Sequence, residues 1–362
     1  MARREWPLAV SIVTTAVFLA FGESWLGRLA DGNWFALVFA WLFAAILVSA
    51  FAVVRHAEAL AARTGEPYGT LVLTLCMSGM EMMMISAVML AGDGAASLAR
   101  DTMLAILMIV LNGLVGVCLL VGALRYREQT YNLYGANSFL AVILPLAVLG
   151  LVLPTFTDST PGPTVSPMQA IFLIVMPVSL YGVFLAIQTR IHKEYFVAPP
   201  ASGEVVTTEK PTESTLMHAA LLIAYAVPIV LLAKQIAVPI NHGILVLGAP
   251  EALGGLLVAV LILAPESMAA VRAAAANQLQ RSINVSLGTA LSTICLTIPA
   301  VLIIGFIIDR NIVLGLDPAN VVILVLTLVV AMLTFALERT NVLLGAVHIL
   351  LFFAYLMLMF EH

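Results

Sequence analysis

The chain has 362 residues, of which 62% are hydrophobic and 10% are charged, and its formal net charge is −4. A soluble domain has about a quarter of its residues charged, so this composition excludes an ordinary soluble protein and makes the lipid bilayer the expected solvent. The small net charge gives no reason to expect nucleic acid as a partner.

Apolar runs long enough to cross about 30 Å of hydrocarbon as helices recur along the chain. The first run follows Arg3 and Arg4, and no small-residue cleavage site comes after it. We therefore interpret it as a transmembrane helix and not as a signal peptide. The sequence predicts an all-α polytopic membrane protein with eleven spans, at residues 7–22, 34–54, 66–91, 102–124, 138–153, 168–188, 216–238, 251–273, 284–308, 318–337 and 342–360.

Lysine and arginine residues are divided unevenly between the two sides that these spans define, with twelve of the sixteen on one side. Because cytoplasmic loops are enriched in Lys and Arg, the N-terminus is expected in the cytoplasm and the C-terminus outside. The twelve are Arg3, Arg4, Arg55, Arg63, Arg125, Arg127, Arg190, Lys193, Lys210, Arg272, Arg281 and Arg339, and the other four are Arg28, Arg100, Lys234 and Arg310.

The longest polar stretch, residues 193–215, is rich in Pro, Thr and Glu and is predicted to be a cytoplasmic linker. With the first helix set apart, it leaves five spans on each side. The predicted division is an N-terminal helix in 1–33, a first five-helix repeat in 34–192, the linker in 193–215 and a second five-helix repeat in 216–362.

Two spans carry related sequences. GTLVLTLCMSGME at 69–81 aligns without gaps with GGLLVAVLILAPE at 254–266, glycine on glycine and glutamate on glutamate. These are the third and the eighth span, which cross the membrane in opposite directions. Inverted repeats of this kind are typical of secondary transporters, whose ion site lies near the midplane between the repeats.

The two aligned glutamates, Glu81 and Glu266, are expected about 4 Å and about 6 Å from the centres of their spans at 1.5 Å rise per residue. A carboxylate at that depth costs several kcal/mol unless it is protonated, paired or bound to a cation. No Lys or Arg in a span interior offers a partner. The structural alternative is a neutral acid that donates a hydrogen bond to a neighbouring helix.

Two facing carboxylates form a hard, doubly negative oxygen site that suits Ca²⁺. When the site is empty the two charges repel each other, so at least one carboxylate is expected to take up a proton. Cation and protons then compete for the same groups. This mutual exclusion is what an antiporter needs and a channel does not.

Further oxygen ligands are expected near the glutamates. Pro265 removes a helix hydrogen bond and can free a backbone carbonyl, and Thr74 and Ser78 share a helix face with Glu81. For every hydroxyl the alternative is a bond to its own helix carbonyl. The other candidates are Asn112 in the fourth span and Asn284, Ser292 and Thr293 in the ninth, which also carries Thr289 and Thr297.

Several longer segments resemble the bacterial calcium/proton antiporters of the cation/calcium exchanger superfamily, in order and over nearly the whole chain. The segments are GEPYGTLVLTL (65–75) followed by Glu81, ALRYREQTYNLYGANSFL (123–140), SLYGVFLAIQTRIH (179–192), APESMAAVRAA (264–274), NQLQRSINVSLGTALSTICLTIP (277–299) and RTNVLLGAVH (339–348).

This resemblance implies the exchanger fold, with one extra N-terminal helix and two inverted five-helix repeats, in a bacterial inner membrane. It also implies that Glu81 and Glu266 bind Ca²⁺ or H⁺, with Ca²⁺ as transported substrate and no cofactor. Two positions depart from the family pattern: CMSGMEMMM (76–84) replaces a Val-Thr-x-Ile-Glu-Val type of sequence, and Glu338 stands where a small residue is usual.

Other functions remain as alternatives. A Na⁺/Ca²⁺ exchanger, or an antiporter of Na⁺ or K⁺ with the same fold, would need further hydroxyl ligands in the fourth and ninth spans. An intramembrane enzyme is disfavoured because there is no His-Glu-x-x-His motif and because Gly92-Asp93-Gly94 falls in a predicted loop. The three cysteines are interpreted as buried thiols, and the six histidines, mostly at span ends, as interfacial side chains.

Overall fold

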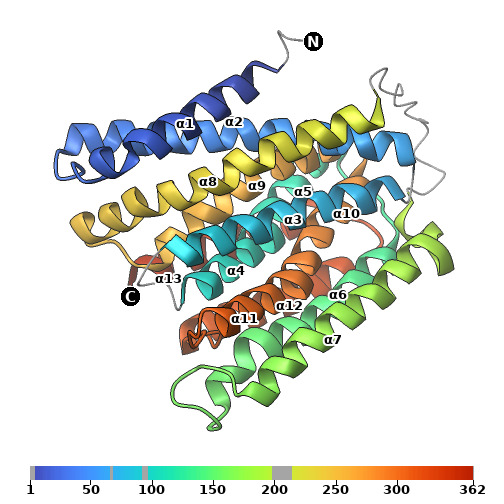
Figure 1. Ribbon diagram of the computed structural model, residues 1–362. Helices are drawn as coiled ribbons and strands as arrows, with labels where there is room; N and C mark the ends of the chain where they lie inside the picture. Colours follow the sequence, from blue (N-terminus) through green and yellow to red (C-terminus); the bar gives the residue numbers. More distant parts are fainter. Residues whose placement is uncertain (1–4, 66–67, 92–96, 198–213, 362) are drawn as a thin grey trace.

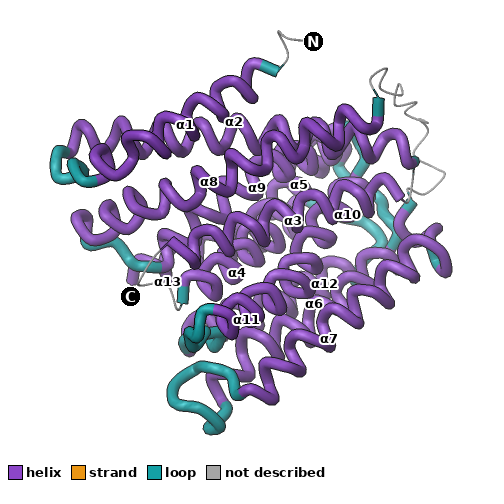
Figure 2. The backbone as a smooth tube through the Cα atoms, in the orientation of Figure 1, coloured by secondary structure: helices purple, strands orange, loops and turns teal. Residues whose placement is uncertain are grey.

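The computed structural model describes residues 5–65, 68–91, 97–197 and 214–361. Eleven helical segments in these ranges are long and apolar enough to cross a membrane. The described residues form helices and loops, and no named strand occurs among them (Figure 2). The predicted number of spans and the all-α fold class are confirmed. Outside the described residues lie most of the predicted linker (198–213), Gly92-Asp93-Gly94, Arg3, Arg4 and Lys210.

Several spans are built from consecutive helical segments. The bounds are α1 Trp6–Leu26, α2 Gly32–Thr64, α3 Tyr68–Ala91, α4 Leu98–Met108 with η2 Ile109–Leu114 and α5 Val115–Tyr126, α6 Leu133–Ala147 with η3 Val148–Val152 and η4 Leu153–Phe156, α7 Pro167–Ala186 with η5 Ile187–Ile191, η6 Lys193–Phe196, α8 Thr215–Leu247, α9 Ala252–Ala275, α10 Leu279–Ser292 with η8 Thr293–Thr297 and α11 Ile298–Ile307, α12 Pro318–Phe335, and α13 Val342–Glu361.

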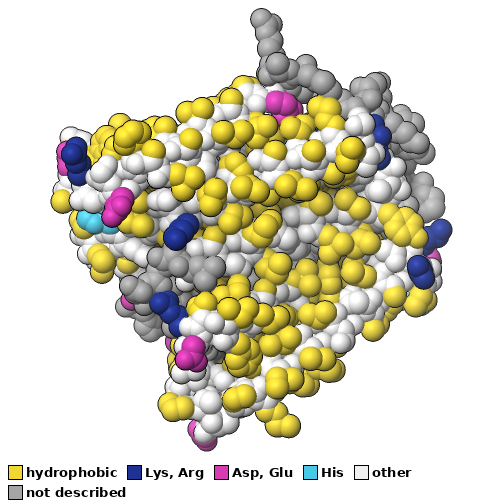
Figure 3. Space-filling model, viewed as in Figure 1, with side chains coloured by type: hydrophobic (Ala, Val, Ile, Leu, Met, Phe, Trp, Pro, Cys, Tyr) yellow, Lys and Arg dark blue, Asp and Glu magenta, His cyan; other side chains and the backbone are white. Residues whose placement is uncertain are grey.

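The bundle has α1, α2 and α8 along one edge and α7 along the opposite edge (Figure 1). α1 packs against both α2 and α8, and α7 packs against α11 and α6. The helices that carry the two glutamates, α3 and α9, lie between these edges. Hydrophobic side chains cover the middle of the face seen in Figure 3, and most charged side chains lie towards its two ends, as expected for a bundle in a bilayer.

The helices α2 and α8 are each 33 residues long and extend beyond the predicted spans 34–54 and 216–238. The extension of α2 carries Arg55 and His56, which bond to Glu5 and to His218 of α8. Polar groups that find partners do not force the helix to end where the apolar run ends. At 1.5 Å per residue each helix is about 50 Å long, so both must tilt across the hydrocarbon or project beyond it.

Glycines of the aligned segments sit at close helix contacts. A Cβ on Gly69 would meet the backbone of α2 at Ala61, and a Cβ on Gly254 would meet Ile240 and Ile244 of α8. Gly255 is also closely packed, because a Cβ there would be 2.7 Å from the amide nitrogen of Thr102 in α4. Small residues allow membrane helices to approach in this way, so these glycines fix α3 and α9 against their neighbours.

Two isolated β-bridges relate the halves of the chain. Thr130, between the fourth and fifth spans, pairs with Arg339 between the tenth and eleventh. Thr164, between the fifth and sixth spans, pairs with Val313 between the ninth and tenth. The two bridges lie on opposite sides of the membrane. The loop that each half contributes to one bridge is the counterpart of the loop that the other half contributes to the second bridge, which is the pattern that inverted repeats produce.

The fourth and ninth spans each contain a π-helical turn in the middle, η2 at Ile109–Leu114 and η8 at Thr293–Thr297. η2 packs on α9, and η8 packs on α3. A π-turn widens the helix locally and is frequent at functional sites. The matched positions of the two turns, one in each half, place a distortion beside each helix that carries a buried glutamate.

Candidate functional site

Glu81 lies in α3 with 1% of its surface exposed. Its Oε2 accepts a hydrogen bond from Thr293 Oγ1 at 3.0 Å, and its Oε1 accepts one from Thr297 Oγ1 at 3.1 Å. Both donors belong to the π-turn η8. Both oxygens of the carboxyl group are therefore directed at the middle of the ninth span.

Glu266 lies in α9 with 6% of its surface exposed. Its Oε2 accepts a hydrogen bond from Thr289 Oγ1 at 2.7 Å. Pro265, the preceding residue, has no N–H, so it removes the helix donor for the carbonyl of Leu261 one turn earlier. A carboxyl and a backbone carbonyl are thus the oxygen groups that α9 brings to this region.

The three threonines that hold the glutamates follow one another at intervals of four residues in α10 and η8: Thr289, Thr293 and Thr297. Residues four apart share a helix face, so one face of the ninth span bonds both carboxyls. The donors to the two different glutamates, Thr289 and Thr293, are separated by a rise of about 6 Å.

Thr293 has two acceptors but one hydroxyl proton. Its Oγ1 lies 3.0 Å from Glu81 Oε2 and 2.9 Å from the carbonyl oxygen of Thr289. A carbonyl can only accept, and a hydroxyl donates once. With Glu81 ionised, Thr293 shares its one proton between the two acceptors; with Glu81 protonated, the acid can donate to Thr293, which then donates to Thr289.

No described lysine or arginine forms an ion pair with Glu81 or Glu266. Within the described residues there is also no group of three or more His, Cys, Asp or Glu side chains that could hold a metal ion. A cation at this place would be balanced by the two glutamates and completed by neutral oxygens.

Three of the ligands predicted from the sequence form hydrogen bonds with groups other than the two glutamates. Ser78 donates to the carbonyl of Thr74, one turn back in α3, and Ser292 donates to the carbonyl of Thr289. Asn284 donates to the carbonyl of Phe196 and accepts from the side chain of Gln280. The structure brings Thr293 to the glutamates, together with Thr289 and Thr297. The four-residue spacing of these threonines was the signal that marks them as one face.

Asn112 of η2 bonds to side chains of the last two helices. Its Nδ2 donates to Thr327 Oγ1 at 2.8 Å, and its Oδ1 lies 3.3 Å from Nδ1 of His348. His348 Nε2 lies 3.0 Å from Thr334 Oγ1. This network, Asn112 with Thr327, His348 and Thr334, is buried throughout. Its role at the glutamates stays a prediction, and it links η2 to α12 and α13.

Three of the six histidines are buried inside the protein. His56, His218 and His348 are 2%, 5% and 0% exposed. Span position in the sequence could not reveal this, because the side chains are covered by helices that are distant in the chain.

A cavity of about 550 Å³ lies between α2, α9 and α10. Pro265, the residue before Glu266 in the sequence, lines it together with Arg55, Glu58, Arg272 and Arg281, and neither glutamate is among its lining residues. It lies at the end of the bundle where α2 ends and α10 begins, which we call the N-terminal side because Glu5 is bonded there to Arg55.

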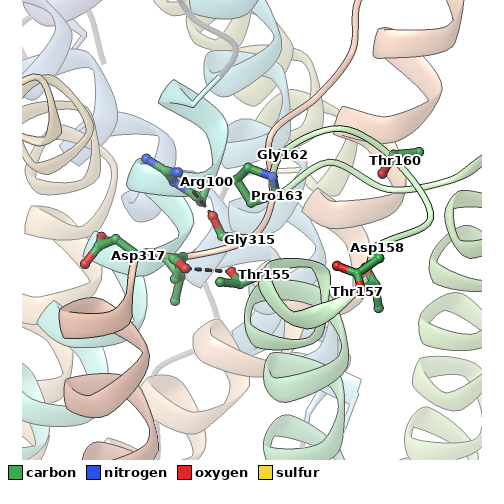
Figure 4. Close-up of a pocket in the computed structure, with 10 residues that line it drawn as sticks. Arg100, Thr155, Thr157, Asp158, Thr160, Gly162, Pro163, Gly315 and Asp317 are labelled. Atoms are coloured by element: carbon green, nitrogen blue, oxygen red, sulfur yellow. Dashed lines mark hydrogen bonds between the residues drawn. The ribbon is translucent and has the colours of Figure 1, made fainter.

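A second cavity, of about 350 Å³, lies at the opposite end (Figure 4). Arg100 donates to the carbonyl of Gly315 there, and Thr155 donates to the carbonyl of Leu316. Asp317, the N-cap of α12, and Asp158 supply its acidic groups. Neither glutamate is among the residues that line it.

A family model described as "Sodium/calcium exchanger protein" matches residues 34–190 and 217–361. The chain belongs to this family. The expected membership of the cation/calcium exchanger superfamily is confirmed, and with it a multi-pass membrane transporter that exchanges cations.

Two relatives of this exchanger match over most of its length. The ionic transporter y4hA of Sinorhizobium fredii is 41% identical over 309 residues, covering 85% of this chain and 84% of that protein. The sodium-potassium/proton antiporter ChaA of Escherichia coli is 41% identical over 319 residues, covering 87% of this chain and 86% of that protein.

Solved structures share the fold at low sequence identity. Native YfkE, named a Ca²⁺/H⁺ antiporter in its selenium-substituted form, superposes with a TM-score of 0.74 and 16% identity over 98% of this chain and 100% of that one. The H⁺/Ca²⁺ exchanger CAX superposes with a TM-score of 0.67 and 14% identity over 97% of this chain and 89% of that one.

Proposed function

We propose that this exchanger carries Ca²⁺ against H⁺ by alternating access, and that Glu81 and Glu266 bind the cation and protons in turn. The observation that carries the proposal is the shared donor face of the ninth span. Two buried carboxyls, one from each half of the chain, are bonded by threonines one turn apart. This arrangement gives one site to which both halves contribute.

Charge balance favours a divalent cation. Two carboxylates in a low-dielectric site without a described cationic partner are costly when both are ionised. One Ca²⁺ or two protons neutralise them equally well. Binding of one ligand therefore requires release of the other, and this competition couples the two fluxes.

The hydrogen bonds at Thr293 support a state in which Glu81 carries a proton in place of the bound cation. Its contacts to Glu81 and to the Thr289 carbonyl are both satisfied when Glu81 holds a proton. When a cation enters, Glu81 loses that proton. The Thr293 hydroxyl then has one proton for two acceptors, the Glu81 carboxylate and the Thr289 carbonyl. The threonine hydroxyl is thus the group whose hydrogen bond changes with the occupant.

The cavity beside Pro265 is the proposed access route from the N-terminal side. We propose that this side is the cytoplasm of a bacterial cell, from the Lys and Arg excess, and that the protein lies in the inner membrane. The proposed repeats are residues 34–192 and 216–362. Proton entry would then drive extrusion of the cation.

A second candidate is exchange of Na⁺ or K⁺ for H⁺. The observation in its favour is the 41% identity to a sodium-potassium/proton antiporter over 86% of that protein. A monovalent cation would leave one carboxylate to be neutralised by a proton, so the same two glutamates could serve it with a different stoichiometry.

Everted membrane vesicles test both candidates. An imposed pH gradient should drive ⁴⁵Ca²⁺ uptake, and addition of Ca²⁺ should collapse the gradient; the same measurement with Na⁺ and with K⁺ ranks the cations. If Na⁺ or K⁺ dissipates the gradient and Ca²⁺ does not, the second candidate replaces the first. Uptake that follows a Na⁺ gradient and ignores pH would overturn proton coupling altogether.

A further inference from the structure

Five ionisable side chains meet where the extra helix joins the two halves of the chain. Glu5 precedes α1, Arg55 and His56 belong to α2, and His218 and Tyr225 belong to α8. Arg55 Nη2 donates to both oxygens of Glu5 at 2.8 Å, and Tyr225 OH donates to Glu5 Oε2 at 2.9 Å. His56 Nε2 lies 3.3 Å from the same Oε2.

At the centre of this cluster two imidazole rings face each other. Nδ1 of His56 lies 3.0 Å from Nδ1 of His218. Of two nitrogens at this distance, one must donate and the other accept, so the pair holds a single proton in the gap. When both rings are protonated, both Nδ1 atoms carry hydrogens, and the contact becomes a repulsion between two cations. The geometry is therefore compatible with one extra proton at most.

The groups around His56 set its charge environment on every side. It faces Glu5, which precedes α1, and Arg55 on its own helix. From α8 it faces His218 and the stacked ring of Tyr225, with the two ring centroids 5.8 Å apart. Burial tends to raise the pKa of Glu5, but the hydrogen bond from Tyr225, the Arg55 charge and His56 outweigh it and hold that pKa below its usual value. Glu5 is thus ionised, and Arg55 already balances it.

The cluster is placed where it can act on the transport path. α2 and α8 are the first helices of the two halves, and they pack on each other along their length. Arg55 also lines the cavity that reaches Pro265, so the side chain that holds Glu5 forms part of that cavity's wall. The His56–His218 contact therefore joins α8 to α2 next to Arg55, the residue of α2 that lines this cavity.

We propose that the His56–His218 pair is a second proton-binding site, separate from the glutamates. When both rings are protonated, the pair separates, α8 loosens from α2 on the N-terminal side, and exchange slows. The pair thereby limits the transporter when that side becomes acidic. The predicted effect on the exchange rate rests on the proposed function. The histidine proton site itself does not depend on which cation is transported.

Everted vesicles expose the N-terminal side to the medium, so its pH can be set directly. At saturating cation the maximal rate of the native protein should fall about threefold or more when the medium is acidified from about pH 8 to about pH 5. His56→Gln and His218→Gln keep a polar side chain that takes up no proton, so their maximal rates should change less than about twofold over the same range. The acid-induced rise in KM, which reports competition at the glutamates, should remain in both.

His242→Gln is the matched control, because His242 lies on the same helix α8 near its other end, against Phe35. It should keep the native pH profile. If His56→Gln and His218→Gln also keep that profile, the pair is not the proton site and the proposal is overturned.

A structural measurement separates this proposal from the proposed function. Spin labels at the exposed Thr64 of α2 and Leu216 of α8, in a chain without its three cysteines, should report a longer or broader distance at about pH 5 than at about pH 8. The change should disappear with His56→Gln. A distance that does not respond to pH in the native pair would overturn the proton site even in a protein that exchanges cations as proposed.

Discussion

Thr289 and Thr293 lie one helical turn apart in the ninth span, and each donates to a different buried glutamate, Thr289 to Glu266 at 2.7 Å and Thr293 to Glu81 at 3.0 Å. The two carboxyls come from α3 and α9, which belong to different halves of the chain. A single helix face therefore sets the spacing of the two acids. This common face is the link between the two carboxyls in the proposed site, since no direct hydrogen bond joins them.

Substitution of either threonine should weaken cation binding without loss of the fold. Thr293→Val and Thr289→Val each remove a hydrogen-bond donor to a charged group, worth about 1.5–3 kcal/mol. KM for the cation should therefore rise by about tenfold or more in a vesicle flux assay. Thr293→Ser keeps the hydroxyl and should restore most of the native KM. Ser292→Ala is the control, since Ser292 bonds only to the Thr289 carbonyl. A native KM in Thr293→Val would show that this hydroxyl does not serve the site.

Neutralising either glutamate should abolish exchange. Glu81→Gln and Glu266→Gln keep the size of the side chain and an acceptor for the threonines, but they can neither balance a cation nor carry a proton. Loss of several kcal/mol of charge interaction, at about 1.4 kcal/mol per factor of ten, predicts a drop in rate of about a hundredfold or more. The measurement is ⁴⁵Ca²⁺ uptake driven by a pH gradient, with Na⁺ and K⁺ compared.

Glu338→Gln is the matched control for both variants, because Glu338 is exposed in the loop that follows α12. It should leave the rate unchanged. Normal exchange by Glu81→Gln or by Glu266→Gln would remove that residue from the proposed site, whatever the cation.

The Asn112 network should matter for stability more than for cation affinity. His348→Phe leaves the Asn112 carbonyl oxygen and the Thr334 hydroxyl buried without their partner. Each such group costs about 1–3 kcal/mol, so the midpoint of thermal unfolding in detergent should fall clearly, while KM for the cation changes little. His242→Phe, at a partly exposed ring, should shift the midpoint much less. A large change in KM with an unchanged midpoint would instead indicate that Asn112 serves the cation.

The span count could be predicted because the length of an apolar run is a local property fixed by the thickness of the bilayer. The ends of α2 and α8 could not, because they depend on contacts between distant residues. His56 continues α2 beyond its apolar run where His218 and Glu5 provide partners. No local sequence pattern predicts that these three residues lie in contact.

The two glutamates could be predicted from the aligned segments, but the residues that contact them could not be ranked. A π-turn changes the angle between successive residues, so the face of the ninth span beyond Thr293 cannot be extrapolated from a regular helix. The same applies to Asn112, whose orientation is set by η2 and by the side chains of Thr327 and His348. Which hydroxyls meet the carboxyls is thus decided by helix distortion and tertiary packing.

The contact of α9 with α4 should be intolerant of any side chain at Gly255. A Cβ there would lie 2.7 Å from the Thr102 amide nitrogen and 2.8 Å from the backbone carbonyl carbon of Asp101, and a helix backbone cannot yield as a flexible side chain can. Gly255→Ala should therefore cost about 1–3 kcal/mol of stability by overpacking, read as a lower midpoint of thermal unfolding, and slow exchange because α9 carries Glu266. Gly182→Ala in α7, where nothing lies within 4 Å of the added carbon, should be neutral or gain up to about 1 kcal/mol from helix propensity. Equal effects of the two substitutions would mean that α9 is free to shift, and that the close approach at Gly255 does not position the glutamate.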